Sequence, residues 1–164
     1  MVLADTNILS TFAKIDQALL LLRLFTDDRL GVVPAVYEEL HTGVNKGYVA
    51  LQAVVKLVRQ GQIDLVVPTA REIFQKDVLP ASFDAGERET LTVAKSRGYA
   101  IVTNETQVKN WCKRERIEYW DLPGVLRALW RTDIVRKEQM QSLIDQIEAN
   151  DRIVFKNKAA ILQG

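Results

Sequence analysis

The sequence Val2-Leu3-Ala4-Asp5-Thr6-Asn7-Ile8-Leu9-Ser10 begins with three apolar residues and then turns polar. The apolar run predicts a short buried strand, and Asp5 follows directly at its end. From residue 7 to residue 25 the spacing of the apolar side chains is helical, at Ile8, Phe12, Ile15, Leu19 and Leu22. The chain therefore opens with a strand, an acid at the end of that strand and a helix.

Beyond this opening, short apolar runs alternate with longer helical patterns. Further strands are predicted over residues 31–33, 63–67, 99–102 and 117–119. Helices are predicted over 36–41, 48–60, 70–76 and 87–97, and from Thr103 onward. This alternation favours an α/β fold with three α/β/α layers, in which helices cover both faces of a mainly parallel sheet of about five strands.

The length of 164 residues fits one domain. We expect an α/β domain over residues 1–133 and a helical extension of the same domain over 134–164. Residues 135–149 are amphipathic, with one apolar stripe formed by Met140, Leu143, Ile144 and Ile147. The stripe fits either closure of the core or pairing with a second subunit, and the sequence does not decide between them.

The composition narrows the class of protein. Hydrophobic residues make up 48% and charged residues 26%, which is typical of a globular protein. The net charge of +1 neither demands nor excludes a polyanionic partner. A single cysteine, Cys112, excludes an internal disulfide and suits a reducing compartment. No leader and no apolar run long enough for a bilayer is visible, so we expect a cytoplasmic protein without a membrane partner.

The positions of the acids are more informative than their number. Each lies beside the end of a predicted strand or at the start of a neighbouring helix: Asp5, Glu38, Glu39, Glu87, Glu89 and Glu105. The carboxyl ends of parallel strands share one edge of a sheet, so these acids are expected to meet there. Clustered carboxylates repel one another unless a cation compensates, and oxygen ligands suit Mg²⁺ or Mn²⁺. His41 and Cys112 are single, which argues against zinc.

The spacing leaves two interpretations of Asp5 open. In one it binds a metal ion while Thr6 and Asn7 hydrogen-bond around it. In the other it only caps the helix that follows, a common role for aspartate at this position.

Four segments resemble the motifs of PIN domains, a ribonuclease fold found in prokaryotic toxins and RNA-processing proteins. The first is the opening sequence already quoted. The other three are Val33-Pro34-Ala35-Val36-Tyr37-Glu38-Glu39-Leu40, Gly86-Glu87-Arg88-Glu89-Thr90-Leu91-Thr92-Val93-Ala94 and Ala100-Ile101-Val102-Thr103-Asn104-Glu105. Each motif alone is weak, but the four occur in the family's order over about residues 2 to 130.

The resemblance implies one or two Mg²⁺ or Mn²⁺ ions and endonuclease cleavage of single-stranded RNA. By position, Asp5, Glu39, Glu87 and Glu105 would be the metal-holding carboxylates, and Thr103 and Asn104 would orient the attacking water or a ligand. Glu89 is the alternative to Glu87, because residues two apart on a helix point about 200° apart. The family also implies a toxin role, a small antitoxin protein that covers the site, and a homodimer.

The fourth motif departs from the family pattern, because Asn104 and Glu105 stand where Asp-Asp is common. This change could weaken a second metal ion or leave the protein inactive. The alternative function is therefore a PIN-like module that binds RNA or a protein without cleaving. An aspartate at a strand end also occurs in phospho-acceptor receiver domains, but their second acid pair and lysine are not clearly placed here.

Basic residues are in excess between residues 105 and 137, with eight against five acids, and three tryptophans lie among them. Basic and aromatic side chains together are typical of single-strand binding. We predict RNA contacts at Lys109, Lys113 and Arg116, and at Lys14 on the first helix. For Trp120 and Trp130 a place in the core or in an interface is the preferred interpretation.

Overall fold

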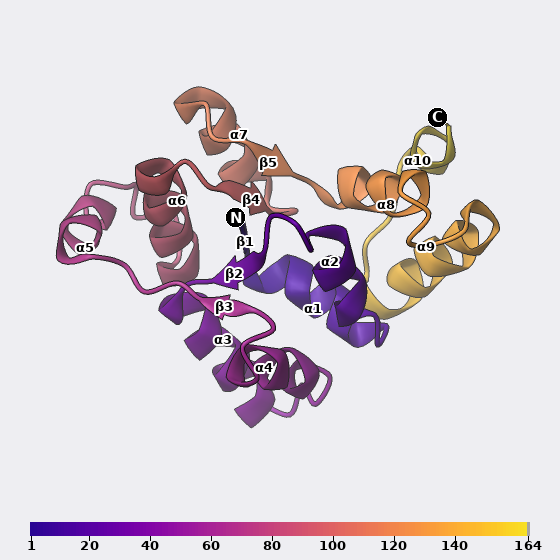
Figure 1. Cartoon of the computed structure of the whole chain (residues 1–164), viewed down its shortest axis with the longest axis horizontal. Coiled ribbons are helices and arrows are strands. Elements are labelled where there is room, and N and C mark those ends of the chain that lie inside the picture. The colour runs from indigo at the N-terminus through magenta and orange to yellow at the C-terminus, as the bar shows by residue number, and fades with distance from the viewer. Residues whose placement is uncertain (164) are drawn as a thin grey trace.

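The computed structural model describes residues 1–163, and its centre is a parallel sheet (Figure 1). The strands within this part of the chain are β1 (Val2–Ala4), β2 (Leu30–Val32), β3 (Asp64–Leu65), β4 (Ala100–Val102) and β5 (Tyr119–Trp120). They lie in the order β3-β2-β1-β4-β5, and every neighbouring pair is parallel. Helices flank the sheet, which confirms the predicted three-layer α/β/α fold.

The helices connect the strands and close the chain. Between the strands lie α1 (Thr6–Lys14), α2 (Ala18–Leu24), α3 (Pro34–Asn45), α4 (Leu51–Arg59), α5 (Ala70–Lys76), α6 (Ala85–Arg97) and α7 (Thr106–Glu115). After the sheet come α8 (Leu122–Arg131), α9 (Lys137–Asp151) and α10 (Lys158–Leu162). None of the helices within residues 1–163 has the length and apolar character needed to cross a membrane.

The helix predicted over residues 7–25 is in fact two helices. Its apolar spacing continues through the break, so periodicity gives no sign of it. Asp16 adopts a left-handed backbone conformation, with φ of 56°, directly after α1 ends. The backbone N–H of Gln17 then returns to the carbonyl of Phe12 at 2.8 Å. A left-handed residue of this kind ends a helix, and the chain turns before α2 begins.

The break predicted between the helices over 36–41 and 48–60 is present but shorter than predicted. Gly43 falls inside α3, which runs to Asn45, and the chain turns at Gly47, whose φ is 98°. A Cβ at Gly43 would lie 2.5 Å from Cδ1 of Leu51, at the start of α4. The glycine therefore permits close packing of α3 on α4 and does not break the helix. Elsewhere the predicted strand over residues 63–67 is reduced to two residues of ladder, Asp64–Leu65.

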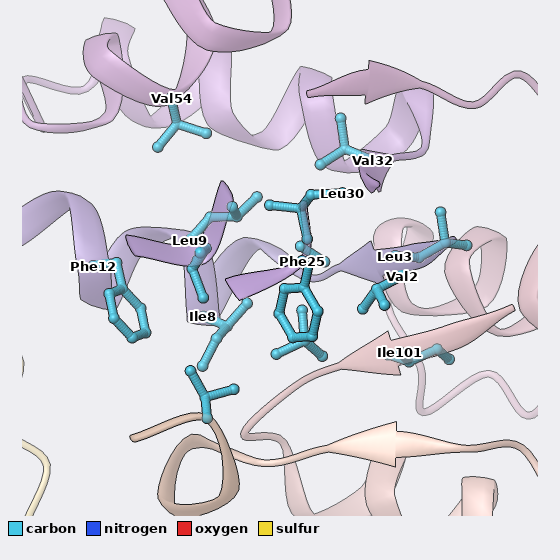
Figure 2. Packing of buried hydrophobic residues seen from close by; sticks show 14 of the residues in the cluster. Val2, Leu3, Ile8, Leu9, Phe12, Phe25, Leu30, Val32, Val54 and Ile101 are labelled. Carbon is cyan, nitrogen blue, oxygen red and sulfur yellow. The ribbon is translucent and has the colours of Figure 1, made fainter. Parts of the chain in front are cut away.

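The core is built around β1, whose three residues are all buried (Figure 2). Leu3 and Ile101, on the neighbouring strands β1 and β4, have no exposed surface, and neither have Ile8 and Phe12 of α1. Burial on both faces is what a central parallel strand requires. Asp5, the residue after β1, therefore lies at the carboxyl edge of the sheet, at the end of its central strand.

The C-terminal helices pack on this same core. The predicted apolar stripe of α9 is buried within the chain, and α9 contacts α1 and α8. Asp151, the last residue of α9, accepts hydrogen bonds from Thr11 and Lys14 of α1. The division into residues 1–133 and an extension over 134–164 stays a prediction, and its last residue, Gly164, lies outside the described part.

Candidate active site

The strand order reverses between β1 and β4. The chain passes from β1 to β2 and β3 on one side of the sheet, and then returns to place β4 and β5 on the other. Ligand sites in open parallel sheets lie outside the carboxyl ends of the strands at such a point. Asp5 follows β1 and Thr103 follows β4, so both residues stand at the reversal.

A small cavity of about 110 Å³ opens at this point, and acids dominate its lining. We call it the acid cavity. Its lining residues are Asp5, Thr6, Asn7, Val36, Glu39, Asp84, Gly86, Glu87 and Glu105. All four carboxylates predicted from the motifs line it, together with Asp84, and no lysine or arginine does. Four separate segments of the chain therefore bring negative charge to one place.

Asp5 is the most deeply buried of these acids, with 6% of its surface exposed. Its Oδ1 accepts the backbone N–H of Ile8 at 2.8 Å, so it caps α1, and its Oδ2 accepts the hydroxyl of Thr103. Burial raises the pKa of Asp5 to about 7 against the lowering effect of both hydrogen bonds, and the charges of Glu105 and Glu87 raise it further. One side chain thus caps the helix and lines the cavity, so the two interpretations of Asp5 do not exclude each other.

Glu39 reaches the cavity from α3. Its carboxylate accepts the hydroxyl of Thr6 and, at 3.0 Å, the backbone N–H of Gly86 in the first turn of α6. Desolvation raises the pKa of Glu39, and the charge of Asp84 adds to the effect. Glu38, its neighbour in sequence, is exposed and does not line the cavity.

Glu87 and Glu89 have separate roles on α6. Glu87 lines the acid cavity and forms a reciprocal capping box with Asp84, through contacts of 2.8 and 2.9 Å. Its pKa is raised by desolvation and by the charges of Asp84, Glu105 and Glu39. Glu89 is buried elsewhere and accepts the backbone N–H of Ala35 at 2.7 Å, which caps the start of α3. The geometry therefore favours Glu87 over Glu89 for the site.

Two residues of the fourth motif, Asn104 and Glu105, line different cavities. Glu105 lines the acid cavity and accepts a hydrogen bond from the side-chain amide of Asn7. Thr103 is fully buried, and its Oγ1 accepts the backbone N–H of Glu105 at 3.1 Å while donating to Asp5. Asn104 does not line the acid cavity and lines a second cavity beside it. The replacement of an acid by Asn104 therefore removes no charge from the lining of the acid cavity.

The donor set of the acid cavity fits a hard divalent cation. It consists of carboxylate, hydroxyl and amide oxygens, and three of its carboxyl groups have raised pKa values because they are desolvated close to other acids. Across residues 1–163, no three side chains of His, Cys, Asp or Glu already stand in an arrangement that could hold one metal ion. The carboxylates of Asp5, Glu39 and Glu105 instead accept hydrogen bonds from Thr103, Thr6 and Asn7.

The predicted RNA-binding residues are not equivalent. Lys14 forms an ion pair with Asp151 and so helps to hold α9 on α1. Lys109 and Lys113 are one helical turn apart on α7, on the side that begins at Glu105, and neither forms an ion pair with another described residue. Arg116 is exposed at the end of that helix.

All three tryptophans are partly buried and pack against the core. Trp120 packs edge-on against Phe25, with ring centroids 5.8 Å apart, and the indole N–H of Trp130 donates to the carbonyl of Ile161 at 2.7 Å. Both are partly buried against the core, as preferred from the sequence. Trp111 packs against Phe83, and the guanidinium of Arg114 lies 3.7 Å from the centre of its ring.

Sequence reasoning missed Asp84, which lines the acid cavity and caps α6. A signal for it was present, because an Asp three residues before a Glu at the start of a helical pattern indicates a capping box. His41, by contrast, lies against the ring of Tyr37 and not in the acid cavity.

A family model described as a PIN domain matches residues 1–161, a span that includes the whole sheet and every residue of the acid cavity. No curated protein and no solved structure matches the chain significantly.

Proposed function

The chain belongs to the PIN domain family, and from this premise we propose that it is a metal-dependent endoribonuclease that hydrolyses single-stranded RNA. PIN domains are generally nucleases, and those nucleases commonly use divalent metals. The observation that carries the proposal is the acid cavity. Two carboxylates that follow β1 and β4, with others on α3 and α6, line one space at the reversal of strand order, where ligands of such sheets bind.

We assign the metal to Asp5, Glu39, Glu87 and Glu105. When bound, Mg²⁺ or Mn²⁺ supplies positive charge that favours deprotonation of the attacking water and stabilises the developing charge on the phosphate. The pKa values of Asp5, Glu39 and Glu87 are raised because these carboxylates are poorly solvated and lie close to other acids. Their negative charges therefore repel one another in the metal-free protein. A divalent cation relieves that repulsion, so binding and ionisation of these acids favour each other.

The polar neighbours of the acids position them. Thr103 donates to Asp5 Oδ2 while the Ile8 N–H holds Oδ1, so both oxygens of that carboxylate are fixed. Thr6 and the Gly86 N–H hold Glu39 in the same way. Hydrogen-bond donors of this kind orient the carboxylates that bind a metal ion and limit their motion. Fixed carboxylates allow the phosphate to be placed accurately relative to the attacking water.

The basic side of α7 offers a path for the RNA backbone. Lys109 and Lys113 extend from Glu105 along one side of the helix, so their ammonium groups can contact phosphates next to the bond that is cut. Arg116 continues this surface. Lys14 is a poorer candidate than the sequence suggested, because Asp151 already neutralises it.

The test is cleavage of a labelled single-stranded RNA by the purified chain with Mg²⁺, with Mn²⁺ and with EDTA. We expect cleavage that needs the metal and falls at least a hundredfold in Asp5→Asn. Asp28→Asn is the matched control, because Asp28 is exposed and accepts no side-chain hydrogen bond within the described residues. Cleavage that survives both EDTA and Asp5→Asn would overturn the proposal.

The non-cleaving alternative keeps one supporting observation. The carboxylates of the cavity accept hydrogen bonds within the protein, and their present spacing forms no metal site among residues 1–163. RNA binding without turnover, at metal concentrations that saturate the site, would favour this alternative. The toxin role, the antitoxin and the homodimer stay predictions.

A further inference from the structure

A second cavity, of about 300 Å³, lies beside the acid cavity. One wall is the segment 153–157 between α9 and α10, and the others come from α8, α10 and Asn104. We call it the strap cavity, after that segment. Figure 1 shows α8 and α10 close together at the C-terminal end of the chain. Its volume is at the lower end of the range found for small-ligand sites.

The strap cavity has the opposite charge to its neighbour. Arg127 and Lys156 line it, and no acid does. The lining of the acid cavity carries acids and no base. The two linings meet in the sequence at Asn104 and Glu105, whose Cα atoms are about 3.8 Å apart, as in any pair of consecutive residues. An anion in the strap cavity therefore has cations beside it, whereas an anion at the acid cavity needs a bound cation between it and the acids.

Arg127 has hydrogen-bonding capacity left over. One terminal nitrogen donates to the carbonyl of Ala160 at 3.1 Å, which fixes the guanidinium at the cavity wall. Its Nε is buried and has no partner within residues 1–163. A buried donor of a charged group is costly to leave unpaired. Lys156 is exposed, and neither Lys156 nor Arg127 forms an ion pair in the described part of the chain, so no carboxylate of the protein neutralises either cation there.

The strap itself is held in place. Glu148 of α9 accepts the backbone N–H of Phe155 at 3.1 Å and the ammonium of Lys158 at 2.5 Å. Asn157 caps α10 by accepting the N–H of Ala160 at 3.1 Å. The cavity is therefore formed before any ligand arrives, which lowers the entropic cost of binding. Phe155 and Ile153 give it an apolar wall beside its cations.

We propose that the strap cavity binds one nucleotide of the RNA strand next to the position that is cut. Arg127 and Lys156 bind its phosphate, the apolar wall receives its base, and Asn104 offers an amide to the edge of the base. This inference rests on the proposed function for its substrate class. A single-stranded polyanion fits better than an acidic peptide, because the cavity combines cations with an aromatic wall and adjoins the site assigned to phosphodiester chemistry.

RNA binding in EDTA tests this proposal without any cleavage. The probe is a fluorescent single-stranded RNA of mixed sequence, and anisotropy gives its Kd over a series of salt concentrations. For Arg127→Gln/Lys156→Ala we expect binding about tenfold weaker. We also expect a shallower salt dependence, since each phosphate contact to a single strand adds about 0.7 to the slope. The matched control is Lys56→Ala/Arg59→Gln, which removes two exposed cations from α4.

Single variants show whether a loss of binding in the double variant comes from a folding defect. Lys156 is exposed, so Lys156→Ala alone should keep the fold and weaken RNA binding by less than the double variant does. Arg127→Lys keeps the charge and should bind RNA more tightly than Arg127→Gln.

The result of the RNA-binding experiment does not depend on whether the protein cleaves RNA. Weaker binding only in the strap variants supports the subsite even if the protein never cleaves RNA. Unchanged binding in the strap variants, or an equal loss in the α4 control, overturns the subsite even if cleavage is strong. Binding of an acidic peptide at the strap cavity in place of RNA would also overturn it.

Discussion

The backbone N–H of Gly86 lies 3.0 Å from Oε1 of Glu39, and a Cβ added at Gly86 would lie 2.6 Å from that same oxygen. Gly86 is in the first turn of α6 with an ordinary helical backbone, so its role is not conformational. The absence of a side chain lets the carboxylate of α3 dock on the start of α6. This contact joins two of the segments that line the acid cavity.

Gly86→Ala should therefore damage the site and leave the fold intact. The added methyl group forces the Glu39 carboxylate to move, which is inexpensive because that carboxylate ends a flexible side chain. We expect about tenfold weaker Mn²⁺ binding by titration calorimetry, with the free energy of unfolding unchanged within about 1 kcal/mol. Gly124→Ala is the control, because Gly124 also lies in the first turn of a helix but outside the acid cavity. Equal Mn²⁺ affinity in both variants would contradict this role for Gly86.

Asp5→Asn should stabilise the metal-free protein at alkaline pH. Folding raises the pKa of Asp5 from 3.8 to about 7, so the folded state binds more protons between these values, and stability falls as pH rises through them. Asparagine carries no charge at any of these pH values and still caps a helix well. We expect the variant to gain on the order of a few kcal/mol at pH 8 and almost nothing at pH 3.

Thermal or urea unfolding in EDTA, compared at the two pH values, measures this difference. Asp28→Asn is the control, because Asp28 is exposed and does not line the acid cavity. Added Mg²⁺ should raise the stability of the wild type and not that of Asp5→Asn, since only a native state that binds the ion gains from it. A destabilised Asp5→Asn at pH 8 would contradict the raised pKa.

Asn104→Asp should not strengthen metal binding. From the motif alone, this substitution restores an acid that the family commonly carries, and it would be expected to complete the metal site. The structure places Asn104 in the lining of the strap cavity, which Arg127 also lines. We therefore expect unchanged Mn²⁺ affinity and weaker binding of single-stranded RNA in EDTA, because the new carboxylate repels phosphate. A clear gain in metal affinity would show that residue 104 belongs to the acid cavity.

The part of the site that the sequence predicts depends on local pattern. Asp5 and Glu105 follow apolar runs, so their place at the carboxyl edge of the sheet follows from the strand assignments alone. The hydrogen bond from Thr103 to Asp5 joins residues 98 positions apart and depends on the pairing of β1 with β4, which no local pattern contains. Asn104 and Glu105 likewise look equivalent in the sequence, and only the turn after β4 sends them to different cavities.

The fold, like the site, has features that follow from local sequence patterns and others that depend on tertiary contacts. Helix and strand types follow from periodicity, but the break at Asp16 does not, because the apolar spacing continues across it. The strap over residues 153–157 has no period at all. Its conformation depends on Glu148, which accepts the backbone N–H of Phe155, and on Asn157, which caps α10 by accepting the N–H of Ala160. A cavity made by such a segment appears only once tertiary structure is known.

Glu72→Gln should destabilise the protein at neutral pH and not at strongly acidic pH. Glu72 is almost fully buried, and its carboxylate accepts two hydrogen bonds from Arg97, at 2.8 and 2.9 Å, and one from the backbone N–H of Thr69 at 2.7 Å. The hydrogen bonds from Arg97 lower the pKa of Glu72 from 4.5 to about 2, against the effect of burial. The stabilisation is therefore present above pH 4.5 and is lost as pH falls through about 2.

A glutamine offers Arg97 only one acceptor and brings an N–H₂ group against the other donors. We expect a loss of about 2 kcal/mol at pH 7, in the range for hydrogen bonds to charged groups, and a difference near zero at pH 2. Urea unfolding across this pH range measures both values, and Glu118→Gln serves as an exposed control. Because the pair joins α5 to α6 outside the acid cavity, metal affinity should be unchanged in the folded variant. A loss that persists undiminished at pH 2 would mean that packing, and not the charge of Glu72, stabilises this contact.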